Sequence, residues 1–368
     1  NDHLGLITVS NDYNHSDLSL TKQYSLSEQG YGYLRDCRML AEEGSTSHLY
    51  QRNGRKISRR RNGIQSIDDT GRQRVGNAQI RWAVPIHMQA IEAALKVGLA
   101  KLFPDTDHQR IEGMYGQLNL VYICAMNKTA GVGKLPQVYC EDKSGRLNGL
   151  GGICLQHIHR ELRQIVLQDS HEYDFENCHW NILQQKSGIT SPAIDNYTEN
   201  CEEVRQAIAD RVGITYTDAK VALLSLLFGA RRGTSERYSS IPKMIGKEKA
   251  ESLYADPDWK ALYKAVKESR AAMIEQAQVY TGGGSRAGMT VNIRGKTRKG
   301  KPAKILAHLL QGWEAELLHK VLHRYGDNMI LLQHDGWGME SEVEPSEIKA
   351  LIQDRTGLKM PITHKQIK

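Results

Sequence analysis

Asp174 and Asp335 are the residues of this sequence best suited to chemistry. Asp174 ends a short predicted strand, and Asp335 follows the apolar run 329–333, which predicts a buried strand. A carboxylate fixed at a strand end is costly to bury without a cationic partner. Two such carboxylates can share divalent metal ions, one activating an attacking oxygen and the other stabilising the leaving one. The pair therefore indicates two-metal-ion chemistry.

A lysine and an aromatic residue share one face of a helix predicted over residues 218–228. Phe228 follows Lys220 by eight residues, slightly more than two turns, so both side chains point from nearly the same side. A cation there can hold a triphosphate while the ring packs on a sugar or a base. Taken alone, the segment is explained better by a core helix with one lysine that reaches solvent.

Two glycine-containing segments indicate nucleic acid as a partner. In the run DKSGR at 142–146, Gly145 lets backbone approach a strand while Arg146 binds a phosphate or a base edge. Gln311 precedes a glycine inside a predicted helix, where glycine costs about 1 kcal/mol relative to alanine. A glycine in this position is explained if another chain or a ligand approaches the helix backbone closely.

Composition limits the class of protein. The chain has 368 residues, with 49 Lys and Arg against 42 Asp and Glu, and 40% of its residues are hydrophobic. This excludes a disordered or collagen-like chain. It lacks a membrane-length apolar stretch and a signal-peptide core, so we expect a soluble, cytoplasmic protein. Two basic runs favour a phosphate backbone as partner: Arg52, Arg55, Lys56, Arg59, Arg60 and Arg61, then Arg294, Lys296, Arg298, Lys299, Lys301 and Lys304.

Periodicity predicts the elements that must position these residues. Apolar residues at three- and four-residue steps predict a helix from Val84 to Phe103, with Pro85 in its first turn. The segment 171–183 predicts a short strand that runs into a helix. Irregular structure or short helices are expected in the first eighty residues. Further helices are expected over 154–167, 201–212, 218–228 with Thr217 as cap, 302–322 and 346–354.

These motifs, in this order, resemble those of a known family. The order is DxxGR at 142–146, an aspartate at a strand end, a K-x7-FG helix, a QG helix, and an HD pair after a strand. It is similar to the polymerase domain of the family A DNA polymerases and of their relatives, the single-subunit phage-type RNA polymerases. The resemblance covers about residues 137–339, and residues 1–136 match only in being long enough for a thumb.

The resemblance implies an α+β right-hand polymerase fold with an antiparallel-sheet palm, helical fingers and a helical thumb. Residues 1–136 would form the N-terminal, thumb-like helical region, 137–183 and 301–368 the palm, and 184–300 the fingers. The partners would be a nucleic-acid template, the growing strand and nucleoside triphosphates, with accessory proteins unidentified. A stand-alone polymerase of this size suggests DNA replication by a phage, plasmid or other mobile element in the host cytoplasm.

The resemblance also implies roles for single residues. Asp174 and Asp335 would bind two Mg²⁺ ions, or Mn²⁺ in their place. Lys220 would grip the incoming triphosphate and protonate the pyrophosphate leaving group. The other positions implied at the nucleotide are Phe228, His179 and Phe175. Those implied at the primer and template are Arg146, Gly145, Gln311 and His334.

The sequence departs from the family pattern at its phosphate clamp and at its sugar site. Tyr216 stands where the fingers helix usually has an arginine, so the phosphate clamp is either incomplete or completed by Arg231 or Arg232. Gly336 follows the HD pair, where the DNA polymerases have an acidic residue. His179 occupies the steric-gate position, and Phe228 lacks the hydroxyl of the tyrosine found in the RNA polymerases.

The favoured function is a template-directed nucleotidyltransferase. DNA synthesis is favoured over DNA- or RNA-templated RNA synthesis, because the QG pair and the compact motif spacing outweigh Gly336. A metal-dependent nuclease would also use paired aspartates, but it would not need Lys220 and Phe228 on one helix face. A non-catalytic nucleic-acid-binding protein explains the basic runs but not Asp174 and Asp335 at strand ends.

Overall fold

The computed structural model describes most of the chain from residue 79 onward. The described residues are 7–10, 23–26, 66–67, 73–75 and 79–367, apart from 130, 143, 151–153, 231 and 280–301. They form helices and antiparallel sheets, so the chain has the mixed α+β composition that the sequence predicts.

A four-stranded antiparallel sheet carries the aspartates. Its order is β10 (Met329–Leu332), β11 (Gly336–Met339), β9 (His171–Phe175) and β12 (Ile362–Gln366). Side chains alternate between the two faces of each strand. On β9, Tyr173 and Phe175 are buried in the core with Trp337 of β11, whereas Glu172 and Asp174 occupy the opposite face. Tyr173 and Phe175 therefore pack into the core on one face of β9, and the other face is left for Glu172 and Asp174.

A second antiparallel sheet lies beside the first. It runs β3 (Ser66–Ile67), β4 (Gln73–Val75), β5 (Gln79–His87), β7 (Val132–Glu141) and β6 (Met126–Thr129), and β8 (Leu147–Leu150) also pairs with β7. Because β7 crosses residues 136 and 137, the expected division there is not a boundary in the structure. Strands also occur in the first eighty residues, including the pair β1 (Ile7–Ser10) and β2 (Gln23–Leu26).

The helix expected over 84–103 is partly wrong. Residues up to His87 belong to β5, where Val84 and Ile86 are buried with Pro85 between them, a period of two rather than 3.6. Helix α2 begins only at Met88 and ends at Val97. Gly98, with φ of 94°, separates it from α3 (Leu99–Leu102), and α4 (His108–Cys124) follows.

Helices α5 (Arg160–Val166) and α6 (Cys178–Ser187) flank β9, and the expected helix over 201–212 is α8 (Cys201–Val212). The cap expected at Thr217 is wrong, because α9 (Tyr216–Leu227) begins earlier. Thr215 Oγ1 accepts a hydrogen bond from the Asp218 N–H (3.0 Å), and the Asp218 carboxylate accepts one from the Thr215 N–H (3.3 Å). The remaining helices are α7 (Pro192–Glu199), α10 (Ser240–Ile245), α11 (Lys247–Ala255), α12 (Pro257–Val279), α14 (Pro302–Tyr325), η2 (Gly326–Asn328) and α15 (Pro345–Thr356).

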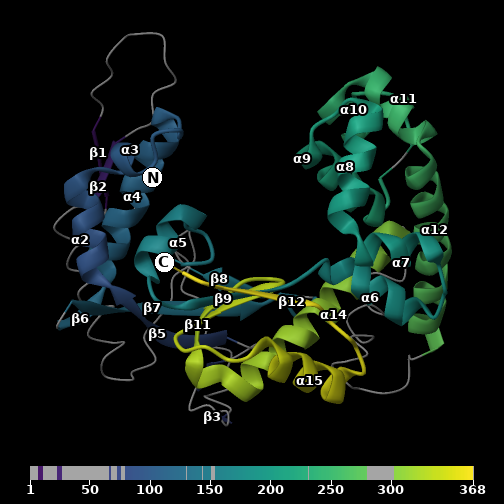
Figure 1. Ribbon diagram of the computed structural model, residues 1–368. Helices are drawn as coiled ribbons and strands as arrows, with labels where there is room; N and C mark the ends of the chain where they lie inside the picture. Colours follow the sequence, from purple (N-terminus) through teal and green to yellow (C-terminus); the bar gives the residue numbers. More distant parts are fainter. Residues whose placement is uncertain are drawn as a thin grey trace.

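The helices form two groups on opposite sides of the central strands. Figure 1 shows α2, α3 and α4 rising on one side and α8 to α12 on the other, with α14 and α15 beneath the four-stranded sheet. Each group contributes to its own hydrophobic core, and strand β10 reaches both cores. Within the described ranges, no helix has the length and apolar character needed to cross a bilayer.

Candidate active site

The structure brings Asp174 and Asp335 side by side. Asp335 lies in the tight turn between β10 and β11, which is closed by a hydrogen bond from the Gln333 N–H to the Gly336 carbonyl (2.9 Å). The Phe175 N–H donates to the carbonyl of Asp335 (2.8 Å), and Gly336 pairs with Asp174 across the strands. Two residues far apart in the sequence are therefore neighbours on adjacent strands.

The two carboxylates repel each other. Partial burial, and then the negative charge of Asp335, raise the pKa of Asp174 to about 7. The positive charge of Lys220 acts in the opposite direction, which places this lysine of α9 within electrostatic reach of Asp174. A second cation close to the pair would relieve the remaining repulsion.

We expect Asp174→Asn to raise thermal stability in a pH-dependent way when divalent ions are removed with EDTA. The pKa of Asp174 is about 7 when folded against 3.8 unfolded, so its contribution to stability falls as the pH rises through that window. The neutral amide of asparagine has no such loss. The gain in melting temperature over the parent should grow from pH 4 to about 7 and then level off.

The control is Asp354→Asn, which changes an exposed aspartate of α15. Its difference from the parent should stay flat across the same pH range. A pH-independent effect of Asp174→Asn would contradict the raised pKa.

Gly336 is required by the close approach of β9. A Cβ at this position would lie 2.9 Å from the carbonyl oxygen of Tyr173 and 3.0 Å from Asp174 Oδ1. The glycine after His334 and Asp335 thus has a steric cause, since a Cβ there fits between the strands only if the backbone shifts.

We expect Gly336→Ala to destabilise the chain by about 1–3 kcal/mol, because the new methyl group must displace backbone as well as the Asp174 carboxylate. Chemical denaturation measures the change. Gly116→Ala on α4 is the control, because a Cβ there meets nothing within 4 Å. That variant should gain up to about 1 kcal/mol, as alanine favours a helix over glycine. Equal stability of the two variants would contradict the steric argument.

A buried glutamate on α14 organises the residues around the aspartates. Glu314, 1% exposed, forms an ion pair with Arg146 (Nε to Oε1, 2.6 Å) and another with His179 (Nε2 to Oε2, 2.7 Å). Although burial opposes ionisation, hydrogen bonds from His179 and Arg146 keep the pKa of Glu314 below its usual value. The ionised carboxylate holds both side chains in place.

The turn formed by residues 142–146 positions the Arg146 side chain next to Glu314. Asp142 Oδ1 accepts hydrogen bonds from the backbone N–H groups of Ser144 (2.7 Å) and Arg146 (3.2 Å), which closes the turn. Gly145 adopts φ of 92° and is buried. The expectation that Gly145 touches nucleic acid is thus not supported, because its role is to allow the turn. Arg146 emerges already paired with Glu314.

His179 and Phe228 meet beside the aspartates. His179 lies in the first turn of α6, directly after β9, and its ring meets that of Phe228 edge to face with 5.2 Å between centroids. Phe228 caps α9 at its C-terminal end, so this helix reaches His179 through the ring. Glu314, which pairs with His179, is also among the charges that act on Asp174.

Of the remaining expected site residues, Phe175 is buried, whereas His334 and Gln311 are half-buried. The Phe175 side chain is 1% exposed and packs on Trp337, so the expectation that it contacts nucleotide is contradicted by its burial. His334 is half-buried, next to Asp335, and its Nδ1 has no hydrogen-bond partner among the described residues. Burial, and then the positive charge of Arg146, lower the pKa of His334. Gln311 is half-buried, on α14 three residues before Glu314.

Of the residues expected in the phosphate clamp and the basic runs, the structure describes Arg232 but not Arg231. Arg231 and most of both basic runs, 52–61 and 294–301, lie outside the described residues. Arg232 donates to the Tyr254 carbonyl (3.2 Å) and packs over the Tyr263 ring, so the expectation that it completes the clamp is not supported. Near Tyr216 the structure instead has Arg205, which donates to its hydroxyl (3.5 Å).

Sequence reasoning missed a pocket beside Asp174. The pocket, about 330 Å³ in volume, is lined by three cations and two carboxylates: Arg160, Arg163, Lys365, Glu172 and Asp174. Lys365 forms an ion pair with Glu172 on the polar sheet face (2.6 Å). The period of two in HEYDF at 171–175 puts Glu172 on the same face as Asp174, but nothing local indicates the arginines.

Comparisons with known proteins complete the description of the site. No protein family model and no curated protein matches this sequence. Among solved structures, the chain is similar to the POL domain of Pol1 from M. smegmatis in complex with DNA primer-template and dNTP. The two are 13% identical, with a TM-score of 0.47, over 72% of this chain and 54% of that one. This chain thus spans about half the length of the solved chain, and a likeness at this level says nothing about its activity.

Proposed function

We propose that this chain is a template-directed nucleotidyltransferase that adds nucleoside triphosphates to a growing strand. One observation carries the proposal. Asp174 and Asp335 are side by side where β9 meets the β10–β11 turn, Lys220 of α9 lies within electrostatic reach of Asp174, and Phe228 at the end of the same helix packs against His179. Paired aspartates alone would serve a nuclease equally well. The lysine and the ring add what a triphosphate substrate needs.

The aspartate pair fits divalent cations. Two adjacent carboxylates, one with its pKa raised to about 7 by burial and by the other, form a negative site of oxygen ligands. Mg²⁺ prefers such ligands, and Mn²⁺ accepts them. Asp174 and Asp335 would hold two such ions, which would supply activation of the attacking hydroxyl and stabilisation of the leaving oxygen.

The other residues have roles of their own in this proposal. Lys220 binds the phosphates of the incoming nucleotide and donates a proton to the leaving pyrophosphate. His334 and Gln311 contact the primer and the template. The pocket beside Asp174 supports the proposal, because Arg160 and Arg163 in its lining can contact a phosphate backbone. Arg146 acts indirectly, by fixing Glu314.

DNA synthesis is the favoured reaction. Glu314 fixes the His179 ring, whose side chain is 12% exposed, against Phe228, so little room remains there for a 2′-hydroxyl group. Phe228 also lacks a hydroxyl that would bond to ribose. In this proposal the His179 ring is the sugar-selecting group.

We expect His179→Gly to lower the preference for deoxyribonucleotides over ribonucleotides by about tenfold, the size of discrimination that pocket shape provides. The ratio of kcat/KM for the two nucleotide sets measures it. His179→Ala, which keeps better helix propensity in α6, should show the same loss. An unchanged ratio in both variants would remove His179 from sugar selection.

The experiment that tests the proposed function is a strand-extension assay on the purified full chain. It combines DNA and RNA templates, with and without primer, with each nucleotide set and with Mg²⁺ or Mn²⁺. We expect template-dependent extension with deoxyribonucleotides. Cleavage of the strands without extension would favour the nuclease, and binding without either reaction would favour a non-catalytic nucleic-acid-binding protein.

A further inference from the structure

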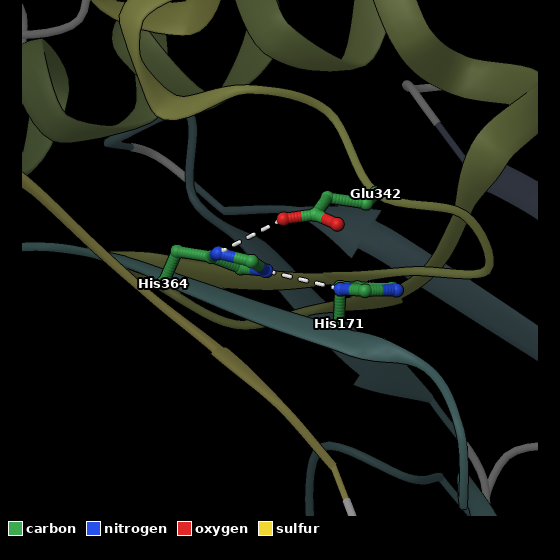
Figure 2. Close-up of side chains that lie close together, drawn as sticks. All are labelled: His171, Glu342 and His364. Carbon is green, nitrogen blue, oxygen red and sulfur yellow. Dashed lines mark hydrogen bonds and ion pairs between the residues drawn. The ribbon is translucent and has the colours of Figure 1, made fainter.

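A second cluster of ionisable side chains lies away from the paired aspartates. His171 of β9, His364 of β12 and Glu342, in the loop after β11, come together at one edge of the four-stranded sheet (Figure 2). One possible ligand atom from each lies within 4.8 Å of the others. His171 is on the same face of β9 as Tyr173, whereas Asp174 is on the opposite face. The cluster therefore lies on the sheet face opposite to the Asp174 side chain, and His364 is the member that also lines the pocket beside Asp174.

The backbone holds these side chains together without any ligand. Tyr173 pairs with His364 across the two strands, and their rings stack with centroids 4.6 Å apart. The Tyr173 hydroxyl donates to the carbonyl of Val343 and accepts from its N–H, each at 2.8 Å. These two bonds fix the loop next to Glu342. Side chains positioned in this way can bind a metal ion with little reorganisation.

The two imidazoles face each other nitrogen to nitrogen. Nδ1 of His171 lies 3.0 Å from Nε2 of His364. Ligand atoms around a tetrahedral Zn²⁺ with bonds of about 2.0–2.1 Å lie about 3.3 Å apart, so the distance between the nitrogens suits two ligands once the rings turn to point both nitrogens at the ion. Glu342 Oε1 lies 3.6 Å from Nδ1 of His364, and the Glu342 side chain is 53% exposed, which leaves it free to turn toward a bound ion.

The loop around the cluster is acidic. Glu340, Glu342 and Glu344 alternate along it. Lys365, which follows His364, points to the other sheet face, where it pairs with Glu172. The local field thus favours a cation.

We propose that His171, His364 and Glu342 bind one divalent transition-metal ion of the zinc type. Two imidazole nitrogens and one carboxylate oxygen suit Zn²⁺, with a water molecule as the fourth ligand. Mg²⁺ prefers an all-oxygen site and does not compete here. The ion joins β9, β12 and the loop after β11, so it stabilises the sheet behind the aspartates. This inference does not depend on the proposed function.

The test measures zinc binding by the full chain. Protein freed of metal with EDTA is titrated with ZnCl₂ in a calorimeter in the presence of millimolar Mg²⁺, and its melting temperature is followed. The titration is repeated with Asp335→Asn, so that zinc at the paired aspartates is not counted. We expect one Zn²⁺ per chain in this variant and a melting temperature higher by about 4 °C at a hundredfold excess over the Kd.

Variants assign the ion to these ligands. Glu342→Gln and His171→Ala should each weaken Zn²⁺ binding by about tenfold or more. Glu340→Gln on the same loop and His157→Ala at an exposed histidine are the matched controls and should bind as the parent does. Absence of binding, or equal binding by Glu342→Gln and the parent, overturns the proposal. If His171→Ala does not fold, Glu342→Gln alone tests the proposal. The Glu342 side chain is half exposed, so this variant is expected to fold.

Discussion

Asp335→Asn should abolish nucleotide addition while leaving the fold and template binding intact. The Asp335 side chain is exposed in the β10–β11 turn, so its amide analogue keeps the backbone bonds of that turn. It loses the negative charge that the proposed metal ions require. We expect kcat for extension to fall by about a thousandfold, which corresponds to about 4 kcal/mol of transition-state stabilisation. Strand extension under single-turnover conditions measures the loss.

Template binding separates this effect from a loss of structure. Removal of one negative charge should leave the Kd for a primer-template duplex unchanged or slightly lower, as fluorescence anisotropy would show. Asp327→Asn is the matched control, since Asp327 is an exposed aspartate at the other end of the same hairpin. It should extend strands at the parent's rate. Extension by Asp335→Asn at a rate close to that of the parent would remove the aspartate pair from the mechanism.

Local periodicity was enough to predict the elements that carry the aspartates. The segment 171–183 forms β9 and α6, and 329–333 contains β10, because short apolar runs next to amphipathic segments specify strand and helix without distant contacts. The two aspartates meet because β9 pairs with β11 in an antiparallel arrangement. Local sequence patterns do not predict this pairing. The expectation depended on the family pattern, and the strand register now gives it a geometric basis.

Errors arose where tertiary pairing overrides local preference. Pro85 suits the first turn of a helix, but the partner strand β7 extends β5 through it as far as His87. At α9, Thr215 and Thr217 are both good caps by residue type, and only Thr215 has an aspartate three residues later to complete the box. That second signal was present in the sequence.

Glu314 could not be found from the sequence because its partners come from distant segments. Arg146 lies in the turn before β8 and His179 begins α6, and both reach α14 only after the chain has folded. A lone glutamate in a helix usually faces solvent. Its position three residues after Gln311, on the same helix face, is the only local hint.

Glu314→Gln should be the most destabilising of these substitutions. The carboxylate is 1% exposed and pairs with Arg146 and His179, so the amide leaves a buried guanidinium without its counter-charge. Breaking a buried pair in this way costs about 3–5 kcal/mol. Chemical denaturation measures the change. The control is Glu251→Gln on α11, which removes one exposed ion pair to Lys247 (4.0 Å). It should cost less than about 1 kcal/mol.

A double variant then separates stability from function. Arg146→Leu with Glu314→Leu removes both charges and replaces them with apolar bulk, a change that is often neutral for stability. We expect it to recover at least half of the loss caused by Glu314→Gln. Strand extension should stay low, because His179 no longer has the carboxylate that holds its ring against Phe228. Recovery of both stability and extension would mean that Glu314 serves the fold alone.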